Sequence, residues 1–212
     1  TNVLAETVII ATGASAKWLG MEDEKRLNGY GVSACATCDG FFYKGKDVVV
    51  VGAGDTAAEE ATYLAKMCTK VTMLVRRDKM RASKAMQHRV FNTENLEVLF
   101  NQNTKSINGE PGVVGVESVT AVNNITNKET VIPASGFFVA IGHKPNSDLF
   151  KGQLEMDDNG YLIIEPGTSK TKIPGVFAAG DIADHVYRQA VTSAGTGCMA
   201  ALDAERFLAD QE

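Results

Sequence analysis

The stretch that decides the fold is Asp47-Val-Val-Val-Val51 followed by Gly52-Ala53-Gly54-Asp55-Thr56-Ala57. An unbroken β-branched run is typical of a central parallel strand that is covered on both faces. Residues 55–68 then change to helical spacing, and Val71-Thr-Met-Leu-Val75 predicts a second strand. Together they predict a βαβ unit of about 30 residues with a right-handed crossover, and hence an α/β fold.

The turn between this strand and its helix matches the dinucleotide pattern G-x-G-x-x-A. Gly52 permits a tight turn, Gly54 lets the backbone approach a pyrophosphate, and Ala57 lets the helix pack closely on the strand. The N–H groups and partial positive charge of the helix N-terminus would hold the phosphates. An ordinary strand–helix turn is the alternative.

The end of the second strand indicates which dinucleotide binds. An NAD site usually has Asp or Glu there, roughly 20 residues on, to bond the ribose hydroxyls. In this chain Val75 is followed by Arg76, Arg77, Asp78 and then Arg81. Arginines at this place can grip a 2′-phosphate, which favours NADPH over NADH. A solvated basic patch is the alternative, and Asp78 can pair with either neighbouring arginine and dilute the charge.

A pair of cysteines lies upstream, in Ser33-Ala-Cys35-Ala-Thr-Cys38-Asp39-Gly40. Both thiols fall within one helical turn, near enough to form a disulfide. We favour a reversible disulfide, because a turn or helix start around such a pair can lower a thiol pKa. Asp39 can give or accept the proton when a thiolate leaves, or it can cap a helix.

Zinc and inert structural thiols are the rival uses of this pair. Structural zinc needs four ligands, usually from a second pair at comparable spacing, and the sequence has none, so we predict no metal. Cys68 and Cys198 are both predicted to lie in the core. The histidines are scattered singly: His88, His143 and His185.

Thiols alone are not expected to accept hydride from NADPH at useful rates. A flavin normally converts the two-electron hydride into thiol–disulfide exchange. The residues therefore predict a flavin, which would be held by residues outside 17–146.

The rest of the chain predicts further elements and two natural cut points, near residues 16 and 146. Residues 5–13 read as a short buried strand, 82–92 as a polar helix and Asn108 to Gly112 as a turn. A group of short alternating strands is expected near 96–101, 113–122 and 129–132. A buried strand is expected at 137–141, another at Val176, and a small-residue helix at about 190–208.

Composition excludes several classes of function. The 212 residues carry 21 Lys and Arg against 26 Asp and Glu, a net charge of −5. With no basic stretch, nucleic acid is not an expected partner. No apolar run approaches the roughly 18 residues of a membrane span. The start, Thr1 to Leu4, has neither an initiator Met nor the charged start of a signal peptide. We expect a mildly acidic cytoplasmic protein with no membrane partner.

Taken together, these motifs resemble the thioredoxin reductase family of the bacterial low-molecular-weight type, nearly from end to end. The likeness is carried by Ala11 to Gly13, Gly31 to Tyr43, Gly52 to Ala57, Arg76 to Asp78, Gly142-His143, Pro174 to Asp181 and Tyr187 to Gly197.

The resemblance implies a homodimeric FAD enzyme that passes electrons from NADPH through the flavin and the disulfide to thioredoxin. It implies that Cys38 faces the flavin, that Cys35 attacks thioredoxin and that Asp39 is the acid. Asp181 would bond the ribityl chain. The other cofactor contacts implied, besides Gly52 to Ala57 and the arginines, are Thr12, Gly13, Gly142, Arg188, Gln189 and Ala190.

The implied fold is α/β: a three-layer, Rossmann-like NADPH-binding domain, with a parallel sheet plus a β-meander, and a partial FAD-binding domain of the same class. Residues 1–16 would be a remnant of the FAD-binding domain, 17–146 the NADPH-binding domain with the redox disulfide, and 147–212 the C-terminal part of the FAD-binding domain. The family rotates its NADPH domain between two arrangements, with hinges expected near the two cut points.

The sequence departs from the family at two places. Val75 stands where some relatives have His, which removes one contact to the 2′-phosphate. The flavin domain's own N-terminal G-x-G-x-x-G strand and helix are absent, so we expect a truncated chain that lacks on the order of 100 residues. Such a chain would bind NADPH but hold FAD weakly and turn over little. The alternatives are a related flavoprotein (alkyl hydroperoxide reductase type or dithiol oxidase) and a catalytically inactive NADPH-binding fragment.

Overall fold

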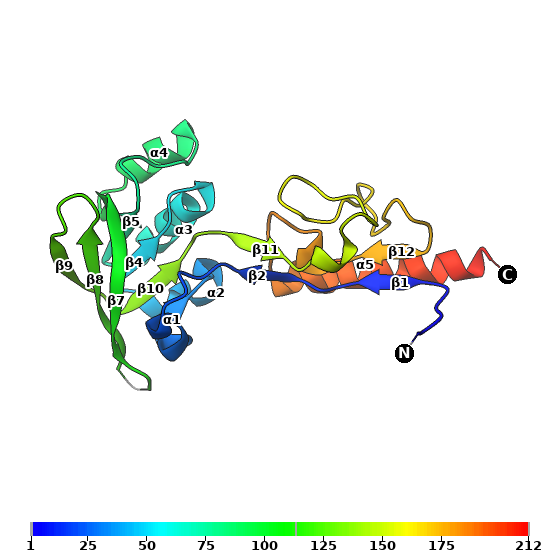
Figure 1. Ribbon diagram of the computed structural model, residues 1–212, viewed down its shortest axis with the longest axis horizontal. Helices are drawn as coiled ribbons and strands as arrows, with labels where there is room; N and C mark the ends of the chain where they lie inside the picture. The colour runs from blue at the N-terminus through cyan, green and yellow to red at the C-terminus, as the bar shows by residue number, and fades with distance from the viewer. Residues whose placement is uncertain (1, 113, 212) are drawn as a thin grey trace. The chain divides into compact units, whose positions relative to one another are not determined.

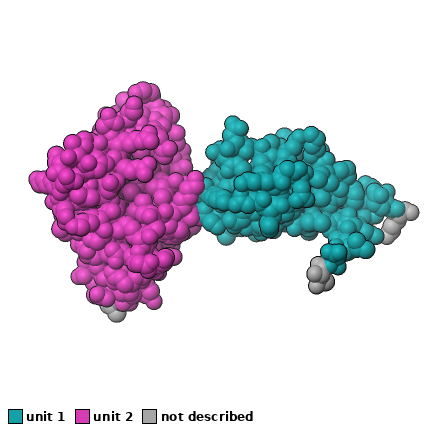
Figure 2. Space-filling view, viewed as in Figure 1, with its two compact units in different colours: residues 1–15, 143–212 teal, residues 16–142 magenta. Residues whose placement is uncertain are grey.

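A computed structural model describes residues 2–112 and 114–211. It divides into two compact units (Figure 2), one formed by residues 16–142 and the other by residues 1–15 with 143–212. Residues 1, 113 and 212, which fall within the predicted domains and the strand predicted at 113–122, lie outside the described residues. No described helix has the length and apolar character needed to cross a bilayer.

The unit formed by residues 16–142 is built on a five-stranded sheet in which every neighbouring pair is parallel (Figure 1). In spatial order the strands are β3 (Val32–Ser33), β10 (Gly136–Val139), β4 (Asp47–Val51), β5 (Lys70–Val75) and β6 (Leu96–Phe100). The predicted α/β class and the βαβ unit are confirmed.

Two helices cover one face of this sheet, and alternate valines of β4 explain how. The helices are α3 (Asp55–Ala65) and α4 (Lys84–Phe91). Val48 and Val50 belong to the apolar cluster that includes Ala57 and Ala61 of α3, whereas Val49 belongs to the cluster on the other face. Successive strand residues point to opposite faces, so a run of valines buried throughout needs a cover on both sides. The prediction for this strand is confirmed.

An antiparallel meander covers the other face and makes the third layer. Its strands are β7 (Gln102–Glu110), β8 (Gly115–Asn123) and β9 (Glu129–Pro133), in that spatial order. Ile107 and Val119 of the meander share an apolar cluster with Val49. Figure 1 shows the meander and the two helices on opposite sides of β4 and β5.

The strand predicted near 96–101 is present as β6, which pairs in parallel with β5 at the edge of the central sheet and not with the meander. One expectation for this region is wrong. The turn expected from Asn108 to Gly112 is shorter, because β7 continues to Glu110. Strand β7 is not predicted from the sequence, because the side chains at its first positions are polar on both faces of the strand.

The elements before the sheet are short. α1 (Glu22–Leu27) buries Leu27 against the meander side, and the buried carboxylate of Glu24 accepts N–H bonds from Leu19, Gly20 and Met21 at 2.9, 2.7 and 2.9 Å. These three hydrogen bonds offset the free-energy cost of burying the Glu24 carboxylate. α2 (Ala36–Asp39) and a 3-10 turn, η1 (Gly40–Tyr43), lead into β4.

The second unit contains β1 (Val8–Ile10) paired in parallel with β12 (Val176–Ala178), and the long helix α5 (Ala190–Ala209). Its other short elements are η2 (Asp148–Phe150) and η3 (Gly180–Ile182). The strand β11 (His143–Pro145) pairs with β2 (Ala14–Ala16), which ends at the boundary between the units. Ile10 is buried, but Val8 and Ile9 are 47% and 43% exposed. The buried strand expected at 5–13 is therefore shorter and only partly covered, because β1 has a single partner strand among the described residues.

The two remaining cysteines differ in their surroundings. Cys68 is buried as predicted, and burial together with the nearby charge of Asp47 raises the pKa of its thiol to about 11. Cys198 is exposed, so its predicted place in the core is wrong. In α5 only Ala200 and Ala204 are buried. Cys198 comes two residues before Ala200, so it lies about 200° around the helix from it, on the opposite side.

Candidate functional site

The turn after β4 has the geometry that its glycines predict. Gly52 has φ +153°, and a Cβ there would lie 2.3 Å from the carbonyl oxygen of Ala140 and 2.6 Å from the Cβ of Ala57. The first glycine and the small Ala57 thus allow the end of β10 and the start of α3 to meet. A Cβ on Gly54, the N-cap of α3, would meet nothing within 4 Å. Gly54 therefore leaves open space at the helix start.

A second loop is fastened to this turn. The carbonyl oxygen of Ala53 accepts N–H bonds from Arg81 at 2.7 Å and Ala82 at 2.9 Å. A carboxylate oxygen of Asp55 accepts the N–H of Ser83 at 2.9 Å, and hydrogen bonding from Ser83 holds the pKa of Asp55 below its usual value. The arrangement fixes the backbone of Arg81 beside the glycine turn.

These loops and the meander enclose a pocket of about 270 Å³ within the unit of residues 16–142. The turn contributes Gly52 and Ala53. The predicted phosphate ligands Arg76, Arg77 and Arg81 all line the pocket, together with Lys79, which belongs to no motif in the sequence. The other lining residues are Leu19, Val51, Leu74, Gln102, Asn103, Thr104 and Ile141.

Four cationic side chains around one pocket create a positive field suited to a phosphate group. Among the described residues no ion pair joins Asp78 to Arg76 or Arg77. Asn124 and Asn101 bond the carbonyl oxygens of Arg76 and Arg77 at 2.7 and 3.0 Å, which fixes the loop that carries both arginines.

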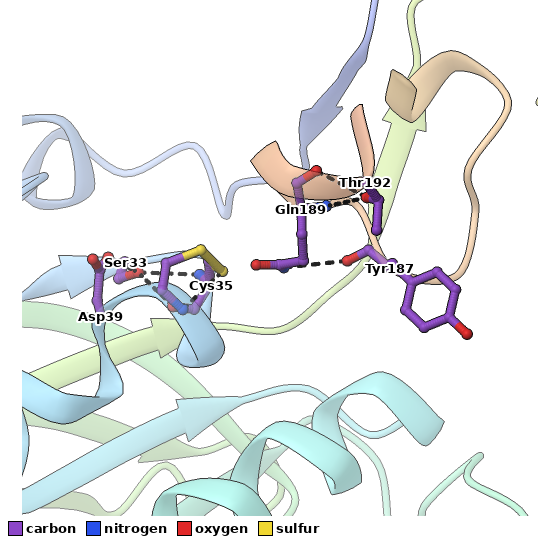
Figure 3. Close-up of a disulfide and its surroundings, with 7 residues drawn as sticks. Ser33, Cys35, Asp39, Tyr187, Gln189 and Thr192 are labelled. Carbon is purple, nitrogen blue, oxygen red and sulfur yellow. Dashed lines mark hydrogen bonds between the residues drawn. A yellow bond between two sulfur atoms is a disulfide. The ribbon is translucent and has the colours of Figure 1, made fainter. Parts of the chain in front are cut away.

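The cysteine pair forms a disulfide at the start of α2 in the same unit (Figure 3). The Sγ atoms of Cys35 and Cys38 are 2.07 Å apart, and Cys35 is the N-cap residue of the helix. The N–H of Cys38 lies 3.2 Å from the Cys35 sulfur. Among the described residues no group of three or more His, Cys, Asp or Glu side chains could hold a metal ion.

A short hydrogen-bond chain connects Asp39 to the backbone N–H of Cys35. The N–H of Cys35 donates to the Ser33 hydroxyl at 3.0 Å, and that hydroxyl lies 2.6 Å from a carboxylate oxygen of Asp39 (Figure 3). The side chain of Asp39 makes no capping bond to η1. Burial, and then the charge of Asp39, raise the pKa of Tyr43. Ser33 was missed because a serine two residues before a cysteine belongs to no recognised pattern.

Of the other cofactor contacts that the resemblance implies, all except Gly142 lie in the unit of residues 1–15 with 143–212. An oxygen of Asp181 accepts the hydroxyl of Ser193 at 3.0 Å. Thr12 and Gly13 are tied to Asn146: the Thr12 hydroxyl donates to its carbonyl oxygen at 3.0 Å, and the Asn146 N–H donates to the Gly13 carbonyl oxygen at 2.9 Å.

The start of α5 is organised by an aspartate that sequence reasoning missed. Asp184 accepts N–H bonds from Val186, Tyr187 and Arg188 at 2.9, 2.8 and 2.9 Å, and Arg188 has φ +50°. Burial alone would raise the pKa of Asp184, but these bonds outweigh it and lower that pKa.

Gln189 begins the helix through a reciprocal capping arrangement with Thr192 (Figure 3). Its backbone N–H lies 3.2 Å from the Thr192 hydroxyl, and its side-chain amide lies 3.2 Å from the carbonyl oxygen of Tyr187. Ala190 is the first residue of α5. Residues 188–190 are thereby held in one conformation.

A dinucleotide-type pocket and a redox disulfide in one α/β unit define a class of protein. The family model for pyridine nucleotide-disulphide oxidoreductases matches residues 1–197, and the chain belongs to this family. Within it, the chain is similar to thioredoxin reductases. It is 52% identical to the thioredoxin reductase of Rickettsia conorii over 204 residues, and 53% identical to that of Dictyostelium discoideum over 208.

Solved structures give the same result. The thioredoxin reductase from Giardia duodenalis matches with a TM-score of 0.90 at 48% identity, and that from Streptococcus pyogenes with 0.90 at 37%. Each comparison covers 96% of this chain and 66% of the other. The alignments with the Rickettsia and Dictyostelium proteins include 96% and 97% of this chain but only 66% and 64% of those proteins.

Proposed function

We propose that this chain is the nucleotide-binding and disulfide-bearing part of a thioredoxin-disulfide reductase, which passes electrons from NADPH by way of FAD to thioredoxin. The observation that carries the proposal is the Cys35–Cys38 disulfide, which lies in the same unit as a cation-lined dinucleotide pocket and whose Cys35 backbone N–H is linked through Ser33 to Asp39. The names and identities of the relatives support it.

The pocket fits NADPH. Open space at Gly54, next to the N-terminus of α3, would admit a pyrophosphate to the N–H groups in the first turn of the helix. Arg76, Arg77 and Arg81 would bind the 2′-phosphate, with Lys79 adding charge. Gly142, which follows the lining residue Ile141, would border the nucleotide.

The flavin would be held in part by residues of the other unit: Thr12, Gly13, Asp181, Arg188, Gln189 and Ala190. When bound, FAD accepts hydride and passes two electrons to a disulfide. Among the described residues, no strand leads into a second G-x-G-x-x-A sequence that could hold the FAD pyrophosphate.

Two thiol–disulfide exchange steps would carry the electrons from the cysteine pair to thioredoxin. In the reduced pair, the Cys35 thiolate attacks one sulfur of the thioredoxin disulfide, which breaks that bond and releases one thioredoxin thiolate. The Cys38 thiolate then attacks the Cys35 sulfur of the mixed disulfide, re-forming Cys35–Cys38 and releasing the second thiolate. Two electrons pass to thioredoxin. Asp39, positioned through Ser33, would supply a proton to a leaving thiolate.

A homodimer and a cytoplasmic location accompany this proposal and stay predictions. A reversible rather than a structural disulfide suits a compartment that keeps most thiols reduced.

The test uses the chain reduced with dithiothreitol and freed of excess reductant. Mixed with oxidised thioredoxin, it should transfer two electrons per chain, measured as new thioredoxin thiols, whereas Cys35→Ser and Cys38→Ser should not complete the transfer. Reduction of a small-molecule disulfide but not of thioredoxin would overturn the proposal in favour of a related flavoprotein. No exchange with either would indicate an inactive nucleotide-binding fragment.

A further inference from the structure

A short loop before α1, residues 18–21, lines two different pockets in the unit of residues 16–142. Leu19 lines the cation-rich pocket, whose other lining residues all come from positions 51–141. Trp18, Gly20 and Met21 line a second pocket of about 130 Å³, together with residues of α1 and its end. Because two open spaces border so short a loop, packing alone does not hold it in place.

Hydrogen bonds to one buried carboxylate hold this loop. The Oε1 atom of Glu24 accepts the N–H of Leu19 at 2.9 Å, and its Oε2 atom accepts the N–H groups of Gly20 and Met21 at 2.7 and 2.9 Å. In the described part of the chain, residues 18–20 make no hydrogen bond between main-chain groups. The conformation of the loop therefore depends on Glu24, and hydrogen bonds to a charged acceptor are the stronger kind.

Leu19 supplies part of the apolar lining of the cation-rich pocket, together with Leu74 and Ile141. It is 38% exposed, so a nucleotide that enters the pocket can cover it. Covering apolar surface favours binding in proportion to the area removed from water. This gain is largest when the side chain is already in place, because ordering a free loop on binding costs conformational entropy.

We propose that Glu24 is a positioning residue for the nucleotide pocket, which holds Leu19 on the pocket wall before a nucleotide binds. The inference rests on the proposed dinucleotide function and deepens it, because it identifies what preorganises one wall of that pocket. Glu24 is not among the described residues that line the pocket, so it acts through the loop and not by touching the nucleotide.

The pattern of the three bonds makes glutamine an informative substitution at Glu24. A glutamine keeps one acceptor oxygen and puts an NH₂ group, which cannot accept from an N–H, in the place of the other. If the retained oxygen keeps the bonds to Gly20 and Met21, the N–H of Leu19 loses its acceptor. Glu24→Gln should therefore release Leu19 and bind NADP⁺ about fivefold more weakly, as Leu19→Ala should.

A double-mutant cycle shows whether Glu24 acts through Leu19. Calorimetric titration of the 212-residue chain with NADP⁺, well below the melting transition, gives the affinities. The variant with both Glu24→Gln and Leu19→Ala should also bind about fivefold more weakly than the unchanged chain. Two independent effects would multiply to about 25-fold.

The matched control is Asp184→Asn in the other unit. The Asp184 carboxylate likewise accepts three N–H groups, two on one oxygen and one on the other. This variant should melt at a lower temperature, as Glu24→Gln should, because each loses a hydrogen bond to a charged group. It should bind NADP⁺ as the unchanged chain does, because the nucleotide pocket lies in the unit of residues 16–142.

The single tryptophan of the chain reports the state of the loop directly. Trp18 directly precedes Leu19 and is 39% exposed. In Glu24→Gln its fluorescence emission should shift to longer wavelength and acrylamide should quench it more strongly, because the released loop exposes the indole ring. Asp184→Asn should change neither signal.

A second variant disturbs the loop without changing α1. Gly20 has φ +84°, and an added Cβ would meet no atom within 4 Å, so Gly20→Ala strains the loop backbone without a clash. It should weaken NADP⁺ binding about fivefold, and this effect should also disappear when Leu19 is alanine. If circular dichroism shows that Glu24→Gln is unfolded, Gly20→Ala carries the test.

The outcomes distinguish the two proposals. If the unchanged chain does not bind NADP⁺, the proposed function itself fails. If it binds NADP⁺ but the folded loop variants bind as tightly, or if their effects multiply with that of Leu19→Ala, positioning by Glu24 is refuted and the dinucleotide site stands. An unchanged Trp18 emission in folded Glu24→Gln would refute it as well.

Discussion

The two glycines of the turn after β4 should respond in opposite ways to the same substitution. Gly52→Ala adds a Cβ 2.3 Å from the Ala140 carbonyl oxygen and 2.6 Å from the Ala57 Cβ, at φ +153°. Gly54→Ala adds a Cβ that meets no atom within 4 Å, at φ −89°. The first change should damage the fold, and the second should damage only ligand binding.

The magnitudes follow from these contacts. A non-glycine residue at the φ of Gly52 costs about 1 to 3 kcal/mol, and overpacking a closed site costs about 1 to 3 kcal/mol more. Because backbone relaxation is shared between the two, we expect a loss of about 3 kcal/mol of unfolding free energy. At Gly54 the backbone suits alanine, so the unfolding free energy should change by less than about 1 kcal/mol, and in the stabilising direction.

The assay is urea unfolding of both variants followed by titration with NADP⁺. Gly52→Ala should shift the unfolding midpoint to lower urea with an unchanged slope. Gly54→Ala should unfold as the unchanged chain does but bind NADP⁺ at least tenfold more weakly, because the new methyl group occupies the space assigned to the pyrophosphate. The reasoning would be refuted if Gly54→Ala were as unstable as Gly52→Ala, or if it bound NADP⁺ with unchanged affinity.

Three further predictions follow from other residues. Replacing Arg76 and Arg77 together by alanine should weaken NADP⁺ binding about 100-fold and leave NAD⁺ binding nearly unchanged in calorimetry, since two charge-assisted contacts are lost only where a 2′-phosphate exists; equal losses for both nucleotides would contradict this. Because its pKa is lowered in the folded chain, Asp184 stabilises above the unfolded value of about 3.9, and this stabilisation is lost as the pH falls through the lower folded pKa. The melting temperature of the unchanged chain should therefore exceed that of Asp184→Asn at pH 7, and the difference should shrink below about pH 4; a constant difference would count against the prediction. Iodoacetamide at pH 8 should label exposed Cys198 in the unreduced chain and spare Cys68, whose thiol pKa is about 11, as peptide mass mapping can show; rapid labelling of Cys68 would disprove its burial.

The sequence predicted those parts of the fold in which local chemistry and tertiary position agree. The valine run of β4 and the glycine turn after it required a two-sided cover and a tight bend, and both are present. Strand β7 was missed because Gln102 and Thr104 face inward although they are polar, and the register shift at Lys105 disrupts the alternation that marks a strand.

The errors at α5 and around the disulfide have a different cause. The helix α5 is rich in alanine, glycine and threonine, so its sequence shows too little apolar contrast to reveal which side packs, and Cys198 was placed on the wrong one. The bonds of Ser33 and Asp184 are set by backbone conformation and distance, which spacing along the chain does not contain.

The most direct measurement for the central claim is the intact mass of a trapped complex. A chain carrying Cys38→Ser and Cys198→Ser, reduced and mixed with oxidised thioredoxin, should form a one-to-one adduct joined through Cys35, because the second attack that would release thioredoxin is blocked. Peptide mapping should locate the bridge at Cys35, and a chain that also carries Cys35→Ser should form none. If the first variant formed no adduct, or one joined through Cys68, the assignment of Cys35 and Cys38 as a thioredoxin-reducing pair would be wrong.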